Sequence, residues 1–223
     1  MRKAFTLVEL LVVIAVIALL AGLIIPMAVG ARQKAAINRT TAELKQLETA
    51  IESYKSKRGH YPPDGTNGPV LTPLFYELTG VVYTDNPLVA ASIFHRLHGG
   101  ETIKQADVQT AFGMGGFINS GYVANPNDSS QIQQTDARDF LPRLEPGKYL
   151  AVTNIIGGIK CTNVVLGITT DGPVMLNSPT TTGVRINPWR YVSSNPTNNT
   201  SSYDLWTDIY NSGNVKRISN WTQ

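Results

Sequence analysis

Glu9 is the first residue in this sequence whose type and position require a chemical explanation. It lies at the start of an apolar segment, because residues 10–29 that follow carry no charge. A carboxylate inside such a segment is unfavourable unless another group compensates for it, so we expect Glu9 to have a partner. The interpretation of the whole chain depends on what that partner is.

Other residues that could do chemistry do not form convincing sets. His95 and His98 are three apart on a predicted helix, but no Asp, Glu or Cys at a fixed spacing completes a metal site, which favours surface histidines. The glycine cluster at 113–116 neither follows a strand nor opens a helix, so no phosphate loop is expected. A single cysteine, Cys161, excludes an intrachain disulfide. No catalytic triad can be argued from the sequence.

The apolar segment at residues 10–29 is long enough to be a membrane helix. About twenty residues at ~1.5 Å each give roughly 30 Å, the thickness of a bilayer core. Arg2 and Lys3 precede it, which predicts a cytoplasmic N-terminus. Gly22 and Pro26 interrupt it, and because proline removes a backbone hydrogen bond, we predict that the helix kinks or melts there.

Three other interpretations of this segment are possible. A secretory signal peptide, cut between Gly30 and Ala31, would have a shorter apolar region and no acid such as Glu9. A plain membrane anchor fits the length but gives Glu9 no role. A buried helix of a soluble protein is disfavoured because the apolar run is so long.

The pattern becomes amphipathic from Ala31 to about Arg58. Apolar residues recur at steps of three and four, which predicts a helix that continues from the apolar segment and packs one stripe on a sheet of the same chain. Gly59 is expected to end the helix, and Pro62 begins a turn-rich exit. The stripe consists of Ile37, Leu44, Leu47, Ile51 and Tyr54.

The residues Lys3-Ala4-Phe5-Thr6-Leu7-Val8-Glu9 resemble the leader junction of type IV pilins and type II secretion pseudopilins. The resemblance implies that prepilin peptidase cuts between Ala4 and Phe5, that Phe5 is then N-methylated, and that Glu9 is the acid of the family motif. Ala4 departs from the glycine usual before the cut but is also small. Residues 1–4 would then be a leader and 5–30 a transmembrane and filament-core helix.

Later segments carry the same resemblance. Residues 50–62 look like the junction between helix and loop in the major pseudopilins, and residues 184–192 and 203–221 resemble their last strands. In that family a loop near the end binds calcium, which makes Asp204 and Asp208 weak candidate ligands. Lys216 and Arg217 stand where the family has acids, so no metal or other cofactor is predicted.

The middle of the chain, residues 66–145, resembles nothing familiar and is interpreted as an insert. Three short helices are predicted within it, at 71–78, 88–97 and 101–112. Strands are predicted from Gly147 onward, at 148–153, 161–169 and 174–177, with Asp171-Gly172 as a hairpin turn between the last two.

Length and charge are consistent with one globular domain, residues 31–223, beyond the helix. The formal charge of +3 falls to +1 when Arg2 and Lys3 leave with the leader, so no nucleic-acid partner is predicted. The missing disulfide favours a pseudopilin over a typical pilin. The predicted fold is α+β: a long N-terminal helix, membrane-spanning in its first half, whose amphipathic second half packs on a small antiparallel sheet.

The resemblance implies a structural subunit of a type IV pilus-like or type II secretion pseudopilus filament, not an enzyme. Its partners would be further copies of itself, prepilin peptidase, an inner-membrane assembly platform and membrane lipid. It would cross the bacterial inner membrane once, with a periplasmic domain, before joining a filament in the periplasm or on the cell surface. The amine of an incoming Phe5 would meet Glu9 of its neighbour. The alternative is a membrane-anchored, non-polymerising periplasmic binding or enzymatic domain, and the sequence leaves open pilus or pseudopilus, major or minor subunit.

Overall fold

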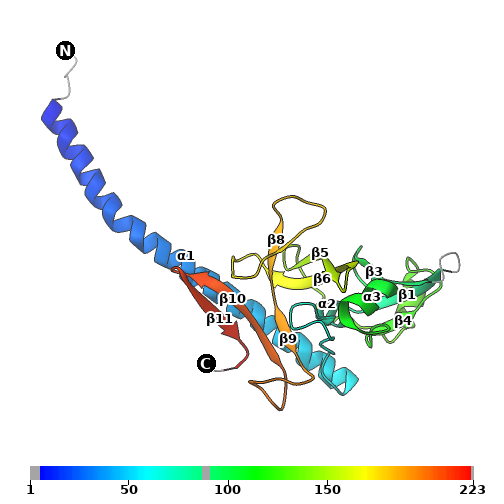
Figure 1. Ribbon diagram of the computed structural model, residues 1–223. Coiled ribbons are helices and arrows are strands. Elements are labelled where there is room, and N and C mark those ends of the chain that lie inside the picture. The colour runs from blue at the N-terminus through cyan, green and yellow to red at the C-terminus, as the bar shows by residue number, and fades with distance from the viewer. Residues whose placement is uncertain (1–5, 87–90, 222–223) are drawn as a thin grey trace. The chain divides into compact units, whose positions relative to one another are not determined.

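The computed structural model describes residues 6–86 and 91–221, except for the side chains of residues 23–29, 86 and 91. The chain divides into two compact units, residues 1–39 and residues 40–223. The first helix, α1 (Leu7–Arg58), begins in the first unit and ends in the second. The fold is α+β, as predicted (Figure 1).

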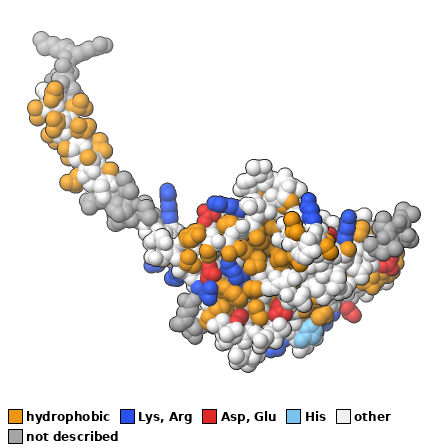
Figure 2. Space-filling model, in the orientation of Figure 1, with side chains coloured by type: hydrophobic (Ala, Val, Ile, Leu, Met, Phe, Trp, Pro, Cys, Tyr) orange, Lys and Arg blue, Asp and Glu red, His pale blue; other side chains and the backbone are white. Residues whose placement is uncertain are grey.

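The described part of the first unit is almost entirely the first part of helix α1. The backbone at Gly22 and Pro26 is helical, so the helix continues through the predicted interruption in the single chain. Large apolar side chains are exposed all round this part of α1, and Figure 2 shows them as an orange surface on the visible face. They are Leu7, Val8, Leu10, Leu11, Val12, Val13, Ile14, Val16, Ile17, Leu19 and Leu20.

Among the residues that the structure describes, no helix has a stretch both long and apolar enough to meet the requirement for crossing a membrane.

In the second unit, the last part of α1 buries one face. Leu44, Leu47, Ile51 and Tyr54 of the predicted stripe are buried. Ile37, the remaining residue of the stripe, belongs to the first unit and is half-buried. The helix ends as predicted, because Gly59 adopts a φ of 83° and its amide donates to the carbonyl oxygen of Lys55 at 2.7 Å. These features confirm an amphipathic helix that supplies part of the core.

The middle region folds into a four-stranded sheet with three short helices. The sheet has the order β3-β2-β1-β4, and β4 is parallel to β1 while the other pairs are antiparallel. Its elements are α2 (Leu74–Thr79), β1 (Val81–Asn86), β2 (Ala91–Arg96), β3 (Thr102–Lys104), α3 (Gln105–Phe112), β4 (Ser120–Tyr122) and α4 (Ser129–Gln133).

Predictions for this region were partly wrong. The helix predicted at 88–97 is strand β2 where it is described, because pairing with β1 buries Phe94 and Arg96 on alternate positions. The helix predicted at 71–78 begins only after Pro73, and the one at 101–112 is strand β3 followed by α3. Short apolar runs fit both the helical and the strand periodicity, so the pairing with neighbouring strands determines which structure forms.

A second four-stranded sheet has the order β5-β6-β8-β7, with all neighbours antiparallel. The predicted hairpin at Asp171-Gly172 is wrong, because β6 pairs with β8 and β7 pairs only with β8. The backbone carbonyl oxygen of Asp171 accepts instead a hydrogen bond from the amide of Tyr210 at 2.9 Å. A Cβ atom at Gly172 would lie 2.1 Å from the carbonyl oxygen of Asp208. This Asp-Gly pair is a contact with another sheet. The strands are β5 (Tyr149–Ile156), β6 (Ile159–Ile168), β7 (Leu176–Asn177) and β8 (Arg185–Pro188).

The third sheet is antiparallel with the order β11-β10-β9. It directly continues the second sheet along the chain, because only Trp189 separates β8 from β9. Leu47 of α1 lines one small cavity together with Trp189 and Leu166, which places the buried stripe of the helix against the sheets, as predicted. Its strands are β9 (Arg190–Val192), β10 (Asp204–Asn211) and β11 (Asn214–Ser219).

Candidate assembly site

Glu9 and Thr6 form a reciprocal cap at the beginning of α1. The Oε2 atom of Glu9 accepts hydrogen bonds from the backbone amide of Thr6 at 2.8 Å and from its Oγ1 at 2.7 Å. The amide of Glu9 donates in return to Thr6 Oγ1 at 3.2 Å. This is a capping box, with Thr6 at the N-cap and Glu9 three residues later. The Thr-x-x-Glu spacing before an apolar run was the sequence signal for it, and the sequence reasoning overlooked it.

The cap gives Glu9 a partner within its own chain, and among the described residues that partner carries no opposite charge. The Glu9 side chain is exposed, and both bonds to it come from neutral groups of Thr6. The bonds hold the carboxylate over the first turn, toward the N-terminal end of the helix. The two predicted processing residues, Ala4 and Phe5, lie outside the described residues. A positive group that approaches the start of α1 would meet an accessible carboxylate.

The apolar surface that follows Glu9 is the second component of the site. Leu7 is 78% exposed, and ten further large apolar side chains up to Leu20 are exposed with it. A helix that is apolar on all sides is stable in water only when something covers it, either lipid or other apolar helices. The chemistry of this site is therefore association through an apolar surface that carries one acid.

A buried carboxylate, Glu77, connects α1 to the middle region, and the sequence reasoning did not identify it. Glu77 is fully buried and accepts from Tyr54 Oη at 2.9 Å and from the amides of Ile118 at 2.8 Å and Asn119 at 2.9 Å. Burial raises the pKa of its carboxyl, although these hydrogen bonds oppose the rise. Nη2 of Arg58 also donates to Asn119 Oδ1 at 2.7 Å. These contacts fix the middle region to the end of α1.

The first weak calcium candidate, Asp204, is surrounded by hydrogen-bond donors. Its carboxylate accepts from the amides of Thr197 at 2.9 Å, Asn198 at 2.9 Å and Asn199 at 2.8 Å, and from Asn198 Nδ2 at 2.9 Å. These bonds lower the pKa of the Asp204 carboxyl against the effect of burial. The carboxylate therefore holds the loop before β10, and its lone pairs point at N–H groups.

The second candidate, Asp208, lies between two arginines. Its Oδ1 is 2.7 Å from Nε of Arg217, and its Oδ2 is 3.5 Å from Nη1 of the buried Arg190. Arg217, which stands where the pseudopilins have an acid, thus supplies the counter-charge of Asp208. Within the described residues, no group of three or more His, Cys, Asp or Glu side chains is arranged to hold a metal ion.

The two histidines lie on and beside strand β2, so the predicted helical arrangement is wrong. His95 is part of the strand, and burial lowers its pKa. His98 follows the strand, and its Nδ1 lies 3.3 Å from Oδ2 of Asp139. Gly113 of the glycine cluster is the left-handed C-cap of α3, where its φ is 70°.

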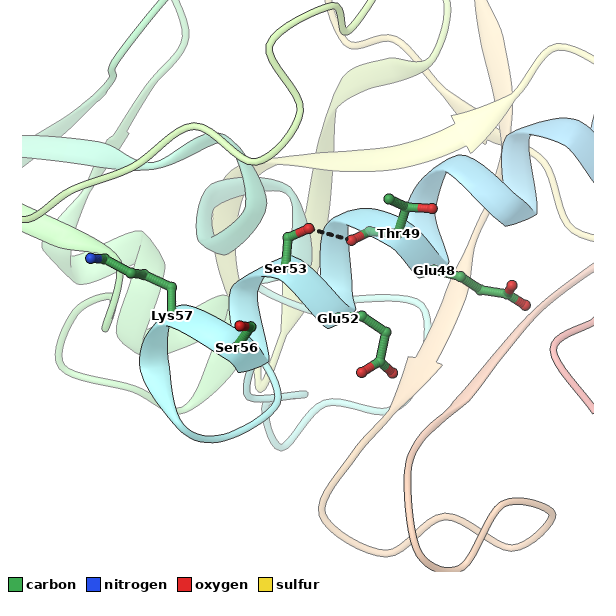
Figure 3. Close-up of a pocket in the computed structure, with 6 residues that line it drawn as sticks. All are labelled: Glu48, Thr49, Glu52, Ser53, Ser56 and Lys57. Atoms are coloured by element: carbon green, nitrogen blue, oxygen red, sulfur yellow. Dashed lines mark hydrogen bonds between the residues drawn. The ribbon is translucent and has the colours of Figure 1, made fainter.

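The polar face near the end of α1 borders an open hollow of about 690 Å³ (Figure 3). Its carboxylates are already engaged, because Glu48 pairs with Lys45 at 2.7 Å and Glu52 accepts from Tyr61 Oη at 3.2 Å. Ser53 Oγ donates to the carbonyl oxygen of Thr49, one turn earlier. The lining side chains are therefore those of an ordinary solvated helix face.

Known proteins match part of the chain, and the family model matches the segment that carries this site. Residues 1–25 match the family model described as "Prokaryotic N-terminal methylation motif". A stretch of 61 residues, 27% of the chain, is 38% identical to "Type II secretion system core protein G" of Escherichia coli (strain K12), of which it covers 42%. The protein of the same name from Klebsiella pneumoniae is 36% identical over 61 residues, 27% of this chain and 44% of its own length.

A fimbrial protein is similar as well. "Fimbrial protein EcpB" of Eikenella corrodens is 43% identical over 58 residues, 26% of this chain and 36% of its own length. The chain thus spans less than half the length of the curated relatives it matches. No solved structure matches the chain. The motif and these relatives confirm the predicted resemblance of the chain to type IV pilins and type II secretion pseudopilins.

Proposed function

We propose that this chain is a structural, non-enzymatic subunit of a type IV pilus-like or type II secretion pseudopilus filament. In this proposal prepilin peptidase cuts between Ala4 and Phe5, and Phe5 is then N-methylated. The N-terminal methylation motif and the relatives, named as secretion core proteins and a fimbrial protein, support it. The observation that carries it is the exposed apolar surface of α1 with a single capped acid, Glu9.

The proposed mechanism is charge pairing between copies. The new amine of Phe5 carries a positive charge, and Glu9 of the neighbouring copy is its counter-charge within an apolar surrounding. The Thr6 cap holds this carboxylate toward the helix start, which suits an approach from another chain. Each pairing would fix the register of addition, while the apolar side chains of α1 cover one another in the filament core.

The proposed location before assembly is the bacterial inner membrane. Residues 10–29 carry no charge, and Arg2 and Lys3 precede them, which supports a single span with a cytoplasmic N-terminus. The domain at residues 31–223 would then be periplasmic, and the assembled filament would lie in the periplasm or on the cell surface. Prepilin peptidase, an inner-membrane assembly platform, lipid and further copies of the chain are the proposed partners.

Three variants separate charge pairing from helix capping. Glu9→Gln keeps a capping-box side chain but removes the charge, and Thr6→Ala removes the capping hydroxyl but keeps the charge. Glu9→Leu removes both the charge and the capping side chain of residue 9. Filament yield and the amount of subunit in the membrane are measured in cells that carry the assembly machinery. Both Glu9 variants should lower the filament yield by about a hundredfold at unchanged membrane levels, because the incoming amine loses its counter-charge. Thr6→Ala should keep most of the yield.

Three results would contradict the proposal. Normal filaments from Glu9→Gln would show that the charge is not used, and loss of filaments in both Thr6→Ala and Glu9→Leu but not in Glu9→Gln would assign Glu9 to capping. An intact Met1 in the mature protein, measured by mass spectrometry, would favour the membrane-anchored, non-polymerising domain.

A further inference from the structure

Strand β5 is an outer strand of its sheet and carries no charged residue. It is eight residues long, Tyr-Leu-Ala-Val-Thr-Asn-Ile-Ile, and it pairs on one side with β6 through a two-residue turn at Gly157-Gly158. Ile155 is 76% exposed and Ile159, just beyond the turn, is 60% exposed. Figure 1 shows β5 beside β6 in this hairpin.

The backbone of β5 has one edge free for a further strand. The amide of Gly167 donates to the carbonyl oxygen of Lys148, which fixes which residues face β6 in the antiparallel ladder. The alternate residues Ala151, Thr153 and Ile155 therefore direct their amide and carbonyl groups outward. Among the described residues, none forms a hydrogen bond with these outward groups.

The other outer strands are protected against pairing. Strands β3, β4 and β9 have three residues each, and β7 has two. Strand β11 is longer but carries two adjacent cations, Lys216 and Arg217. Short length and positive charge are the usual devices that keep an edge from pairing with another chain. Strand β5 is neither short nor charged, so its free backbone edge is open to pairing with another strand.

We propose that β5 pairs antiparallel with β5 of a second copy of this chain, about a two-fold axis at Thr153. The uncharged strand meets no like charge when it faces itself, and the outward-facing residues of both copies coincide at this register. Thr153 lies opposite Thr153 of the other copy, and Ile155 lies opposite Ala151. A large side chain thus meets a small one, and every outward amide of these residues finds a carbonyl oxygen. The pairing does not depend on filament assembly.

A lysine pair tests whether the edge is used. Thr153 and Thr162 lie opposite each other on the same face of the hairpin, with their Oγ1 atoms 3.1 Å apart, but only Thr153 is on the outer strand. The mass of the full chain in detergent is measured over a range of concentrations by analytical ultracentrifugation. Thr153→Lys should raise the dissociation constant of the dimer at least about fivefold, because like charges face each other at the axis. Thr162→Lys should leave it unchanged.

A cysteine pair tests the register. Two Thr153→Cys chains would bring Cα atoms about 5.5 Å apart at a hydrogen-bonded pair, within the range of a disulfide. The Cα atoms of two Ile155→Cys residues would lie about 15 Å apart, because four residues at ~3.4 Å each add to the distance between the strands, and this is out of reach although Ile155 is more exposed. Mild oxidation of the full chain should therefore link Thr153→Cys into dimers much faster than Ile155→Cys or the parent with its buried Cys161.

Several outcomes would overturn the proposal. They are a parent chain that stays monomeric at all concentrations, a dimer as tight in Thr153→Lys as in Thr162→Lys, or equally fast cross-linking of both cysteine variants. If the parent is monomeric, the strand that pairs with β5 would have to be an extended segment of a different protein. Far-ultraviolet circular dichroism of each variant establishes that the fold is retained, and Thr153→Cys tests the edge even when the lysine variant does not fold.

Discussion

Tyr54 of helix α1 donates its hydroxyl hydrogen bond to Glu77 of helix α2 at 2.9 Å, and both side chains are fully buried. The same carboxylate accepts hydrogen bonds from the backbone amides of Ile118 and Asn119. One side chain thus joins α1, α2 and the segment before β4, which are far apart in the sequence. A buried acid with several partners is costly to leave incomplete, and its protonation is linked to folding.

This link predicts how stability depends on pH. Burial raises the pKa of Glu77 above its ordinary value of 4.5, so between that value and the raised pKa the folded chain holds a proton that the unfolded chain has lost. The contribution is complete below pH 4.5 and is lost as the pH rises through the raised pKa. The free energy of unfolding of the parent, measured with urea, should therefore fall relative to that of Glu77→Gln as the pH rises over this window.

An exposed acid on the same helix provides the control. Glu52→Gln removes an acid from the exposed face of α1 and leaves Glu77 in place, so it should keep the fall in stability with pH that Glu77→Gln removes. Parallel profiles for the parent and Glu77→Gln would show that Glu77 does not titrate with folding.

The buried stripe of α1 should dominate the stability of the second unit. Leu47 and Ile51 are buried, so replacing either with alanine removes apolar contacts and leaves a cavity, at a cost of about 2–5 kcal/mol. Gln46→Ala, on the exposed face, should change the free energy of unfolding by less than about 0.5 kcal/mol. Urea unfolding of the three variants checks this, and a small effect at both Leu47 and Ile51 would contradict the packing described.

The long helix and the last strands were predictable because each has a strong local signal. The apolar run after Glu9, the three- and four-residue stripe and the glycine stop at Gly59 all lie within α1, and its described part follows them. The strands after Gly147 are rich in β-branched residues, and β5 and β6 formed where these lie. Local pattern and tertiary structure agree in these segments.

The rest depended on contacts between distant residues. The segment at β2 is apolar and short, and only its pairing with β1 makes it a strand. Nothing near Glu77 in the sequence indicates that Tyr54 and Asn119 surround it, from 23 and 42 residues away. Asp171-Gly172 has the composition of a hairpin turn, but the next strand pairs with β8. The cap at Thr6, in contrast, has a local signal, because Thr-x-x-Glu before an apolar run is the signature of a capping box.

Processing should depend on the size of the residue before the proposed cut. Ala4→Gly should mature as well as the parent or better, whereas the bulky charge of Ala4→Arg should block cleavage in cells that carry prepilin peptidase. Mass spectrometry of the mature N-terminus distinguishes N-methylated Phe5 from intact Met1. Normal maturation of Ala4→Arg would mean that the cut lies elsewhere.

Calcium should not stabilise the folded chain, because both weak candidates already have other partners. Asp204 accepts three backbone amides, and Asp208 faces Arg217 and Arg190, so a cation would have to displace donors or stand beside two positive charges. The melting temperature should differ by less than about 1 °C between millimolar calcium and a chelator. Asp208→Asn should instead destabilise the chain by about 3–5 kcal/mol, because it leaves the buried Arg190 without its counter-charge. A rise of several degrees with calcium that Asp208→Asn abolishes would show that Asp208 is a ligand after all.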